Sequence, residues 1–405
     1  MLRLQAYKFE LRPNGAQMRD MARTAGSCRY VYNRALAMKQ AKYAESAENL
    51  RVFDLINAMK IWKDDEATSW LKDAPSQALQ QSIKDMDRAY QNFFSKRAAF
   101  PRFKKKGMSC SFRFPQGVKL EQDNNRVFLP KLGWIHYRNS REVLGVIKNA
   151  TVSCVNGKWY VSLQTEREVA EALHPATSSI SIDLGVARFA TMSDGSFLSP
   201  LDSFRKKQSK LARYQRAMAR KVKFSKNWHK AKQRVSKLHT HIANARRDFL
   251  HKASATISKN HALVFVEDLK VANMSKSASG TMDAPGRSVR AKSGLNKAIL
   301  DQGWFEFRRQ LEYKLAWQGG QLVAVPPHYT SQTCPRCGHV ARDNRKTQSV
   351  FACVDCGYTN NADVVGAMNI KAAGHAVLAY GELAQSGHSM KYEPAEVATQ
   401  EPAHA

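Results

Sequence analysis

Two pairs of cysteines constrain this chain more than any other feature of its sequence. Cys334 and Cys337 form the first CxxC pair, and after fifteen intervening residues Cys353 and Cys356 form the second. Each pair can bring two thiolates of one tight turn to a single ion, and two pairs complete a tetrahedral site. Four sulfur ligands leave no open position for water, so such a site is structural. The spacing predicts one structural zinc ion, with a redox-active CxxC pair or free buried thiols as the alternatives.

The chain also carries a large surplus of positive charge. Its 405 residues include 64 Lys and Arg against 34 Asp and Glu, a net charge of +30. Residues 201–250 alone hold sixteen Lys and Arg and only two acids. Because a protein that neutralises phosphates releases condensed counterions, this surplus favours a nucleic acid as partner. We expect the basic helical region over residues 204–260 to contact a polyanion, although a run of charge is often only a solvated face.

The sequence argues against several other classes of protein. No apolar run approaches the roughly 18–20 residues needed to span a bilayer. The opening MLRLQAYKFELRPNG lacks the apolar stretch of a secretory signal. Seven cysteines are an odd number, and four of them belong to the metal-type pattern. We therefore expect a cytoplasmic protein of a reducing compartment, without a membrane partner or a disulfide framework.

Hydrophobic periodicity predicts a β-rich module with a helical insertion over residues 1–170. After an opening strand, Asn14 can cap one helix, and a second helix is expected over residues 76–94. Short alternating runs follow, and Asn156-Gly157 predicts a tight hairpin between two strands.

The rest of the chain has a different pattern. Strands and helices alternate over residues 178–373, which predicts a mixed α/β sheet. Residues 374–405 are acidic, rich in Ala, Gly, Pro and Ser, and without sustained periodicity. This composition predicts a disordered tail.

Three carboxylates share a local context that suits a metal ion. Asp183 ends the apolar strand ISI, Glu267 ends the apolar strand LVFV, and Asp363 opens the last helix after the cysteine cluster. Such side chains can converge on one point, and their oxygens suit Mg²⁺; two ions there could activate water and stabilise the leaving oxygen of a phosphodiester. The alternatives remain that acids after strands are turn residues and that Asp363 only caps its helix. Asp268 should face the side opposite to its neighbour Glu267.

An ordered set of motifs over residues 3–373 resembles one family. The set begins with YKFELRPNGAQ and CRYVYNRAL and continues with FPRFKKKG, LPKLG, SIDLGVARFATMSDG and VFVEDL. It ends with GWFEFRRQLEYKLAWQGGQLVAVPPHYTSQTCPRCG and CVDCGYTNNADVVGAMNI. It is similar to the TnpB (OrfB) family, RNA-guided DNA nucleases encoded by insertion sequences and related to type V CRISPR effectors. One departure is that Val365 and Gly366 stand where the family often has Asn and Ala, while Asn369-Ile370 follow the pattern.

The resemblance implies a multidomain fold, α/β and α+β, with a RuvC-like nuclease domain of the RNase H type. In that domain Asp183, Glu267 and Asp363 would be the catalytic residues that bind two Mg²⁺ ions, and one zinc ion would occupy an inserted zinc ribbon. The implied parts are a wedge-like β-barrel over 1–170 with a helical recognition insertion over about 14–100, the nuclease domain over 171–325 and 360–373, the zinc ribbon over 326–359, and the tail over 374–405.

Two basic stretches and one helix are the expected nucleic-acid contacts. Phe224, Trp228 and His229 in the basic helical region could stack on unpaired bases. FPRFKKKGMSCSFRF is a second basic and aromatic stretch. Glutamines on the 76–94 helix could donate to base edges, and their family counterparts suggest reading of a flanking motif, although surface glutamines are common without such a role. The expected contact residues are Gln77, Gln80, Gln81, Arg102, Lys104, Lys105, Lys106, Arg113, Lys221, Lys223, Trp228 and Lys230.

With this resemblance, the sequence predicts an RNA-guided endonuclease of a transposable element in the prokaryotic cytosol, associated with the nucleoid. Its partners would be a guide RNA from the end of the element and double-stranded target DNA, cut beside a short flanking motif by metal-dependent phosphodiester hydrolysis. The alternatives are a nuclease-inactive RNA-guided repressor and a protein-only zinc-ribbon DNA-binding transposition factor. No oligomeric state is predicted.

Overall fold

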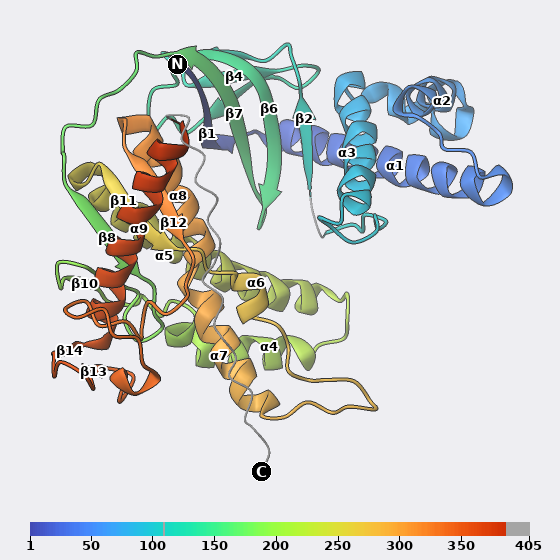
Figure 1. The fold of residues 1–405 in the computed structure, drawn as a ribbon. Coiled ribbons are helices and arrows are strands. Elements are labelled where there is room, and N and C mark those ends of the chain that lie inside the picture. Colours follow the sequence, from blue (N-terminus) through green and yellow to red (C-terminus); the bar gives the residue numbers. More distant parts are fainter. Residues whose placement is uncertain (108–109, 386–405) are drawn as a thin grey trace. The chain divides into compact units, whose positions relative to one another are not determined.

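The computed structural model describes residues 1–107 and 110–385, which fold as two compact units divided between Ala170 and Glu171 (Figure 1). Both units combine helices and strands, so the prediction of a mixed α/β multidomain fold is confirmed. Within the described ranges, none of the helices has both the length and the apolar character that a membrane crossing requires.

The first unit consists of one long sheet and a group of helices inserted after its first strand. Its elements in chain order are β1 (Leu2–Arg12), α1 (Gly15–Ser46), α2 (Val52–Asp64), the 3₁₀ helix η1 (Glu66–Asp73), α3 (Ser76–Phe94), β2 (Ser111–Phe114), β3 (Lys119–Glu121), β4 (Arg126–Leu129), β5 (Gly133–Tyr137), β6 (Val146–Val155) and β7 (Lys158–Glu168).

The sheet of the first unit is open, and the closed barrel that we expected is not formed by the described residues. Its seven antiparallel strands run in the order β2-β6-β7-β1-β5-β4-β3, and no pairing joins β2 to β3 among those residues. These edge strands are only four and three residues long. Helices α1 and α3 contact β2. A short edge strand that helices cover needs no further strand beside it.

Local sequence explains how the helices and the hairpin of this unit form. Asn14 caps α1 through a capping box, since its side chain accepts from the backbone N–H of Gln17 and the Gln17 side chain accepts from the N–H of Asn14. Between β6 and β7, Asn156 and Gly157 have φ values of 53° and 81°. Two positive φ values are what a tight hairpin turn requires, so the predicted hairpin is confirmed.

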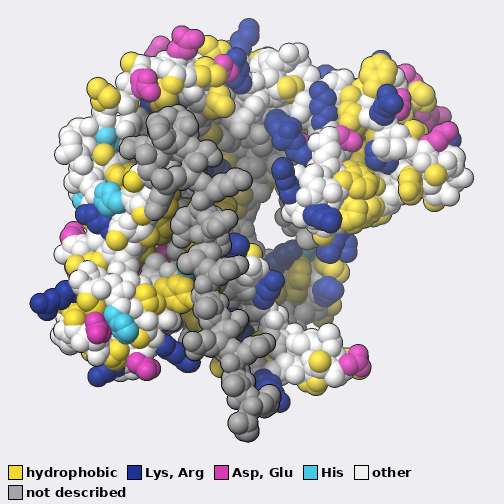
Figure 2. All heavy atoms as spheres, viewed as in Figure 1, with side chains coloured by type: hydrophobic (Ala, Val, Ile, Leu, Met, Phe, Trp, Pro, Cys, Tyr) yellow, Lys and Arg dark blue, Asp and Glu magenta, His cyan; other side chains and the backbone are white. Residues whose placement is uncertain are grey.

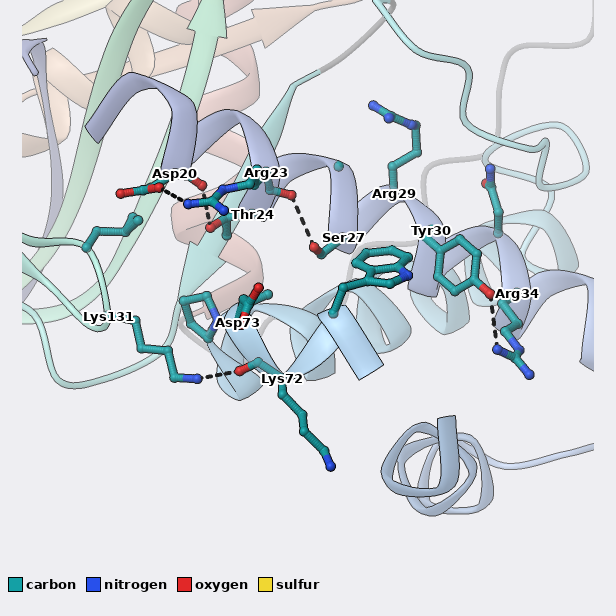
Figure 3. A pocket seen from close by; sticks show the side chains of 16 residues that line it. Asp20, Arg23, Thr24, Ser27, Arg29, Tyr30, Arg34, Lys72, Asp73 and Lys131 are labelled. Carbon is teal, nitrogen blue, oxygen red and sulfur yellow. Dashed lines mark hydrogen bonds and ion pairs between the residues drawn. The ribbon is translucent and has the colours of Figure 1, made fainter. Parts of the chain in front are cut away.

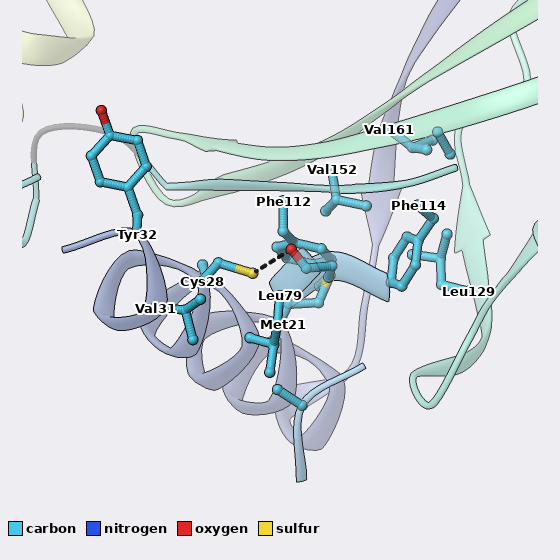
Figure 4. Packing of buried hydrophobic residues seen from close by; sticks show 14 of the residues in the cluster. Met21, Cys28, Val31, Tyr32, Leu79, Phe112, Phe114, Leu129, Val152 and Val161 are labelled. Atoms are coloured by element: carbon cyan, nitrogen blue, oxygen red, sulfur yellow. Dashed lines mark hydrogen bonds between the residues drawn. The ribbon is translucent and has the colours of Figure 1, made fainter. Parts of the chain in front are cut away.

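The core of the first unit lies between the helices and the sheet (Figure 4). Met21 and Cys28 of α1 and Leu79 of α3 are buried there. Phe112 of β2 and Val152 of β6 are buried in the same cluster. Burial of these apolar side chains is what holds the helical insertion on the sheet.

The second unit contains a five-stranded sheet, a helical hairpin and a small cysteine-bearing segment. Its elements in chain order are β8 (Ser179–Asp183), β9 (Ala190–Met192), β10 (Phe197–Leu198), η2 (Arg205–Lys207), α4 (Gln208–Ala219), α5 (Lys226–Asn260), β11 (Leu263–Glu267), α6 (Val271–Met274), α7 (Val289–Gln302), α8 (Trp304–Gln318), β12 (Gln321–Val325), η3 (Arg342–Asn344), β13 (Val350–Ala352), β14 (Thr359–Asn361) and α9 (Ala362–Gln385).

Helices cover both faces of this sheet, whose order is β10-β9-β8-β11-β12 with β8, β11 and β12 parallel. Val264 and Val266 of β11 belong to the core cluster that contains residues of α5 and α8. Phe265, between them, belongs to a separate cluster with Ile370 of α9. Successive side chains of a strand point to opposite faces. Helices α5 and α8 therefore lie on one side of the sheet, and α9 lies on the other.

The prediction of a disordered tail over residues 374–405 is wrong for its first part, which belongs to helix α9. Residues 374–385 continue the helix instead of being disordered, and residues 386–405 lie outside the described ranges. The reason is a tertiary contact: a Cβ added to Gly374 would lie 1.9 Å from Cδ1 of Phe265, and Leu378 packs on the same cluster. The helix approaches β11 closely because position 374 has no side chain, and the composition of the segment could not reveal this partner.

The basic region over 204–260 is helical, as predicted, and its two main helices α4 and α5 form a hairpin. Leu211 of α4 packs with Val235, Leu238 and Ile242 of α5. The chain turns between the two helices, and Ser225 caps α5 by accepting from the N–H of Trp228 at 3.1 Å.

Candidate active site and metal centre

Asp183 and Glu267 lie side by side at the carboxyl ends of two parallel strands. The register pairs Ile182 with Val266, so the next residue of each strand carries a carboxylate at the same edge of the sheet. Asp363 lies in the first turn of α9, where the Asn361 side chain accepts from its N–H at 3.1 Å. Glu267 and Asp363 follow Asp183 by 84 and 180 positions in the chain, and the sheet and its covering helix bring all three to one region.

Helix α9 is held against β8 close to these acids. The hydroxyl of Ser181 donates to the carbonyl oxygen of Ala367. A Cβ added to Gly366 would lie 3.2 Å from Oδ2 of Asp183, so the backbone of α9 approaches this carboxylate directly. Val365, the other departure from the family pattern, is fully buried in the small core around the cysteines.

A cavity of about 200 Å³ lies at this edge of the sheet. Arg345, from the segment between the two cysteine pairs, lines it and lies 3.8 Å from Oδ1 of Asp363. The sequence analysis missed Arg345, because only a tertiary contact distinguishes it from the other basic residues of the chain. The lining residues are Asp183, Glu267, Pro327, Thr330, Ser331, Arg345 and Gly366.

The electrostatics of the cavity favour a bound cation. Burial, followed by the negative charges of Glu267 and Asp363, raises the pKa of Asp183 to about 7, while the charge of Arg345 opposes the shift. Carboxylates crowded in this way destabilise one another unless a positive charge lies between them. The donor set of carboxylate oxygens, together with this repulsion, fits Mg²⁺.

The four cysteines form a more compact group than the acids. In the described ranges they are the only set of three or more His, Cys, Asp or Glu side chains whose ligand atoms all lie within 4.8 Å of one another. The Sγ atoms of Cys334 and Cys356 are 3.6 Å apart, as are those of Cys337 and Cys353. This geometry is consistent with the predicted structural zinc ion.

The backbone conformation and N–H groups of the two cysteine turns favour binding of an ion by thiolates. Gly338 and Gly357, which follow the two pairs, have φ values of 78° and 69°, a conformation that favours glycine. The backbone N–H of Cys356 is the main group that lowers the pKa of Cys353. A lower thiol pKa favours the thiolate form that binds zinc.

The predicted contacts in the basic helical hairpin gather at its tip. Lys221, Lys223 and Lys230 are exposed, and Phe224 is 68% exposed. The rings of Phe224 and Trp228 meet edge to face with centroids 5.5 Å apart, and His229 contacts Trp228. This tip therefore presents an aromatic cluster surrounded by lysines.

Several predicted contacts of the first unit already have partners within the protein. Gln81 is buried and accepts from Arg113 at 2.9 Å, and Arg113 also pairs with Asp85. Lys104 lies 3.9 Å above the ring of Tyr32, and its burial lowers its pKa. The contacts that remain more accessible are Gln77, Gln80, Arg102, Lys105 and Lys106, of which the two glutamines are half-buried.

A larger groove, which the sequence analysis did not identify, lies in the first unit (Figure 3). Its volume is about 1220 Å³, and α1, η1 and the β4–β5 turn contribute its walls. Tyr30 and Trp70 meet there edge to face with ring centroids 5.1 Å apart. Five basic and two acidic residues line it: Arg23, Arg29, Arg34, Lys72, Lys131, Asp20 and Asp73. Figure 2 shows Lys and Arg side chains gathered over the part of this unit that contains α1 and α3.

Fold and site together define a mixed α/β protein in which a zinc-type cysteine cluster adjoins an acidic cavity. Three family models match the chain: the probable transposase OrfB of IS605 over residues 144–278, the Cas12f1-like TNB domain over 304–370, and a helix-turn-helix domain over 1–48. The last range contains β1 and α1 in this structure.

Several relatives extend over more than nine tenths of the chain, two of them at 30% identity or more. "Putative RNA-guided DNA endonuclease InsQ" of Escherichia coli K12 is 59% identical over 397 residues, which cover 98% of this chain and 99% of that protein. A protein of the same description from Streptomyces pristinaespiralis is 32% identical and covers 93% of this chain and 91% of its own length. The chain belongs to the TnpB (OrfB) family, as the resemblance in its sequence predicted.

A solved structure supports the fold. The protein of a Cas12f1–sgRNA–target DNA complex is similar with a TM-score of 0.52 and 14% identity, over 87% of this chain and 81% of that one.

Proposed function

We propose that this protein is an RNA-guided endonuclease of a transposable element that cuts double-stranded DNA beside a short flanking motif. The family membership supports the class of activity, because the two relatives described above are both named as putative RNA-guided DNA endonucleases. The observation that supports the proposal is that Asp183 and Glu267 line one cavity, while the negative charges of Glu267 and Asp363 both act on Asp183.

In this proposal the three acids hold two Mg²⁺ ions in a RuvC-like site. Bound there, the ions would supply an activated water and stabilise the attacking and leaving oxygens of an in-line displacement at phosphorus. Arg345 lines the same cavity and carries a charge that can bind the phosphodiester. Its ion pair with Asp363 keeps the guanidinium beside the acids.

The basic surfaces supply the nucleic-acid binding that guided cleavage requires. Base pairing with a guide RNA would select the target, while the protein binds backbones and reads the flanking motif. We assign backbone contacts to the lysines of the α4–α5 tip and of the 102–106 loop. The groove of the first unit combines five basic side chains with two aromatic rings, which suits a nucleic-acid strand.

The direct test is cleavage by the protein purified with the RNA that co-purifies from cells. With Mg²⁺ it should cut a plasmid that contains the sequence matching that RNA, and Asp183→Ala should bind the same RNA and DNA without cutting. If the purified protein carries only heterogeneous RNA that moderate salt removes, guide binding is wrong. If Asp183→Ala cuts at the parent rate, the acidic site is not the nuclease centre.

A second test addresses the tip of the helical hairpin. Phe224→Ala and Trp228→Ala leave the charge unchanged but remove a surface on which bases can stack, which typically costs about 1–3 kcal/mol per base. RNA affinity measured by filter binding should fall accordingly. Phe197→Ala is the matched control, since Phe197 is 51% exposed but belongs to β10. Equal affinities of all three variants would contradict stacking at this tip.

A further inference from the structure

The side chain of Thr330 has an unusual position for a residue outside the acidic triad. Its hydroxyl donates to Oε1 of Glu267 at 2.7 Å. Thr330 is 8% exposed and lines the same cavity as Asp183 and Glu267. This bond fixes the orientation of the carboxylate and leaves Oε2 of Glu267 able to ligate a cation.

The backbone around Thr330 is fixed by helix α9. Asn369 donates through Nδ2 to the carbonyl oxygens of Thr330 and Thr333, both at 2.7 Å. Asn369 lies on the helix that also carries Asp363, and Thr333 directly precedes the zinc-type ligand Cys334. One side chain therefore ties the cysteine segment, here residues 326–359, to the helix of the third acid, and Thr330 extends that connection to the second acid.

We propose that Thr330 is a positioning residue that orients the carboxylate of Glu267 for the metal ion, and that Asn369 holds Thr330 in place. This inference rests on the proposed metal site of Asp183, Glu267 and Asp363. A hydrogen bond fixes the orientation of the carboxylate before the ion binds. Less rotational entropy of the side chain is then lost on binding, so the affinity for the ion is higher. Loss of such a partner typically lowers metal affinity or activity by about 10–100-fold. The arrangement also explains why a cysteine cluster with no open coordination position adjoins the acids, since its segment supplies Thr330.

The experiment compares Thr330→Val, Thr330→Ser and Thr333→Val in the full chain purified with its RNA. Valine keeps the size of threonine but removes the hydroxyl, whereas serine keeps the hydroxyl. Thr333→Val is the matched control, because the Thr333 hydroxyl donates to the carbonyl oxygen of Tyr329 in the same segment. Mn²⁺ serves as the probe, and free Mn²⁺ is measured by electron paramagnetic resonance to give a binding affinity that is independent of cleavage. The Mg²⁺ concentration that gives half-maximal cleavage is the second readout.

Thr330→Val should weaken Mn²⁺ binding and raise the half-maximal Mg²⁺ concentration by about 10-fold or more. Thr330→Ser and Thr333→Val should behave like the parent, with zinc content and RNA binding unchanged in all variants. A parent-like Thr330→Val overturns the proposal, and so does a Thr330→Ser that is as weak as the valine variant, because packing would then explain the effect. Asp183→Ala distinguishes failure of the proposed metal site from failure of the positioning role of Thr330. If this variant binds Mn²⁺ as the parent does, the metal site is wrong, and so is the positioning role that depends on it.

Discussion

The cysteine cluster and the acidic cavity are neighbours in the second unit, yet they are assembled in opposite ways. Two short turns bring the four sulfur atoms together, and each sulfur of the first CxxC pair lies 3.6 Å from a sulfur of the second pair. The three carboxylates come from β8, β11 and α9, and they do not form a group with all ligand atoms within 4.8 Å.

The difference follows from the chemistry of the ligands. A thiol can stay neutral until the metal arrives, and a CxxC turn fixes the distance between its two sulfur atoms. Carboxylates in water are charged at neutral pH and repel one another, and this repulsion adds to burial in raising the pKa of Asp183. Proteins therefore place such acids on rigid elements that hold them near one another without contact. Four predictions sharpen this contrast, from the largest expected effect to the smallest.

Removal of a single acid should abolish cleavage without loss of folding. Glu267→Gln and Asp363→Ala each remove a charge that the proposed ions need, and the several kcal/mol of stabilisation that metal ions provide correspond to about 10³-fold or more in rate. Single-turnover cleavage and thermal melting measure the two effects. Retained cleavage in either variant would show that the acids do not act as one site.

Loss of one cysteine should disrupt both clusters. The parent should contain about one zinc ion per chain, and Cys334→Ser or Cys353→Ser should lose it together with cleavage, because the cysteine segment carries Arg345 and Thr330. Elemental analysis and cleavage assays are the measurements. Cys154→Ser is the control, since Cys154 lies in β6 of the first unit. Full zinc content in both ribbon variants would contradict the metal assignment.

Displacement of α9 should affect the acidic cavity more than the cysteine cluster. Gly374→Ala would place Cβ 1.9 Å from the ring of Phe265, and overpacking of this kind costs about 1–3 kcal/mol. We expect a lower melting temperature and slower cleavage with normal zinc content. Gly294→Ala in α7 is the matched control, because no atom lies within 4 Å of the added Cβ, and it should stabilise by about 0.5–1 kcal/mol. Equal melting temperatures of the two variants would contradict the close packing of α9.

The smallest effect is expected at Asp268, which directly follows Glu267. Its carboxylate pairs with Arg308 and is half-exposed, so the pair contributes at most about 1 kcal/mol. Asp268→Asn should cleave at nearly the parent rate and melt close to the parent temperature. A cleavage defect as large as that of Glu267→Gln would mean that the acidic site includes a fourth carboxylate.

Local signals predicted much of the secondary structure and the cysteine cluster. The helix over 76–94 has the expected bounds, Asn14 caps α1, and Asn156-Gly157 forms the hairpin turn. The residues that determine each of these features lie within a few positions of one another. The same holds for the two CxxC turns and the glycines that follow them.

Other predictions needed information that no short stretch contains. The sheet of the first unit was expected to close into a barrel, but the described edge strands do not pair. Gln81 and Lys104 stay predicted nucleic-acid contacts, but the structure shows that each also has a partner inside the protein. A glutamine or lysine has the same identity on a free surface and in a contact, so only the packed structure distinguishes the two.

By itself, the sequence determined the ligand chemistry of this protein: four thiolates at fixed spacing, three acids at element boundaries and a strongly basic helical region. The tertiary structure decided which distant residues join them. Arg345 and Thr330 enter the acidic cavity from the cysteine segment, and α9 docks on β11 because Gly374 lets the helix approach Phe265. These contacts join residues far apart in the chain, and their energy comes from burial and hydrogen bonds that exist only once the sheet and its helices have packed.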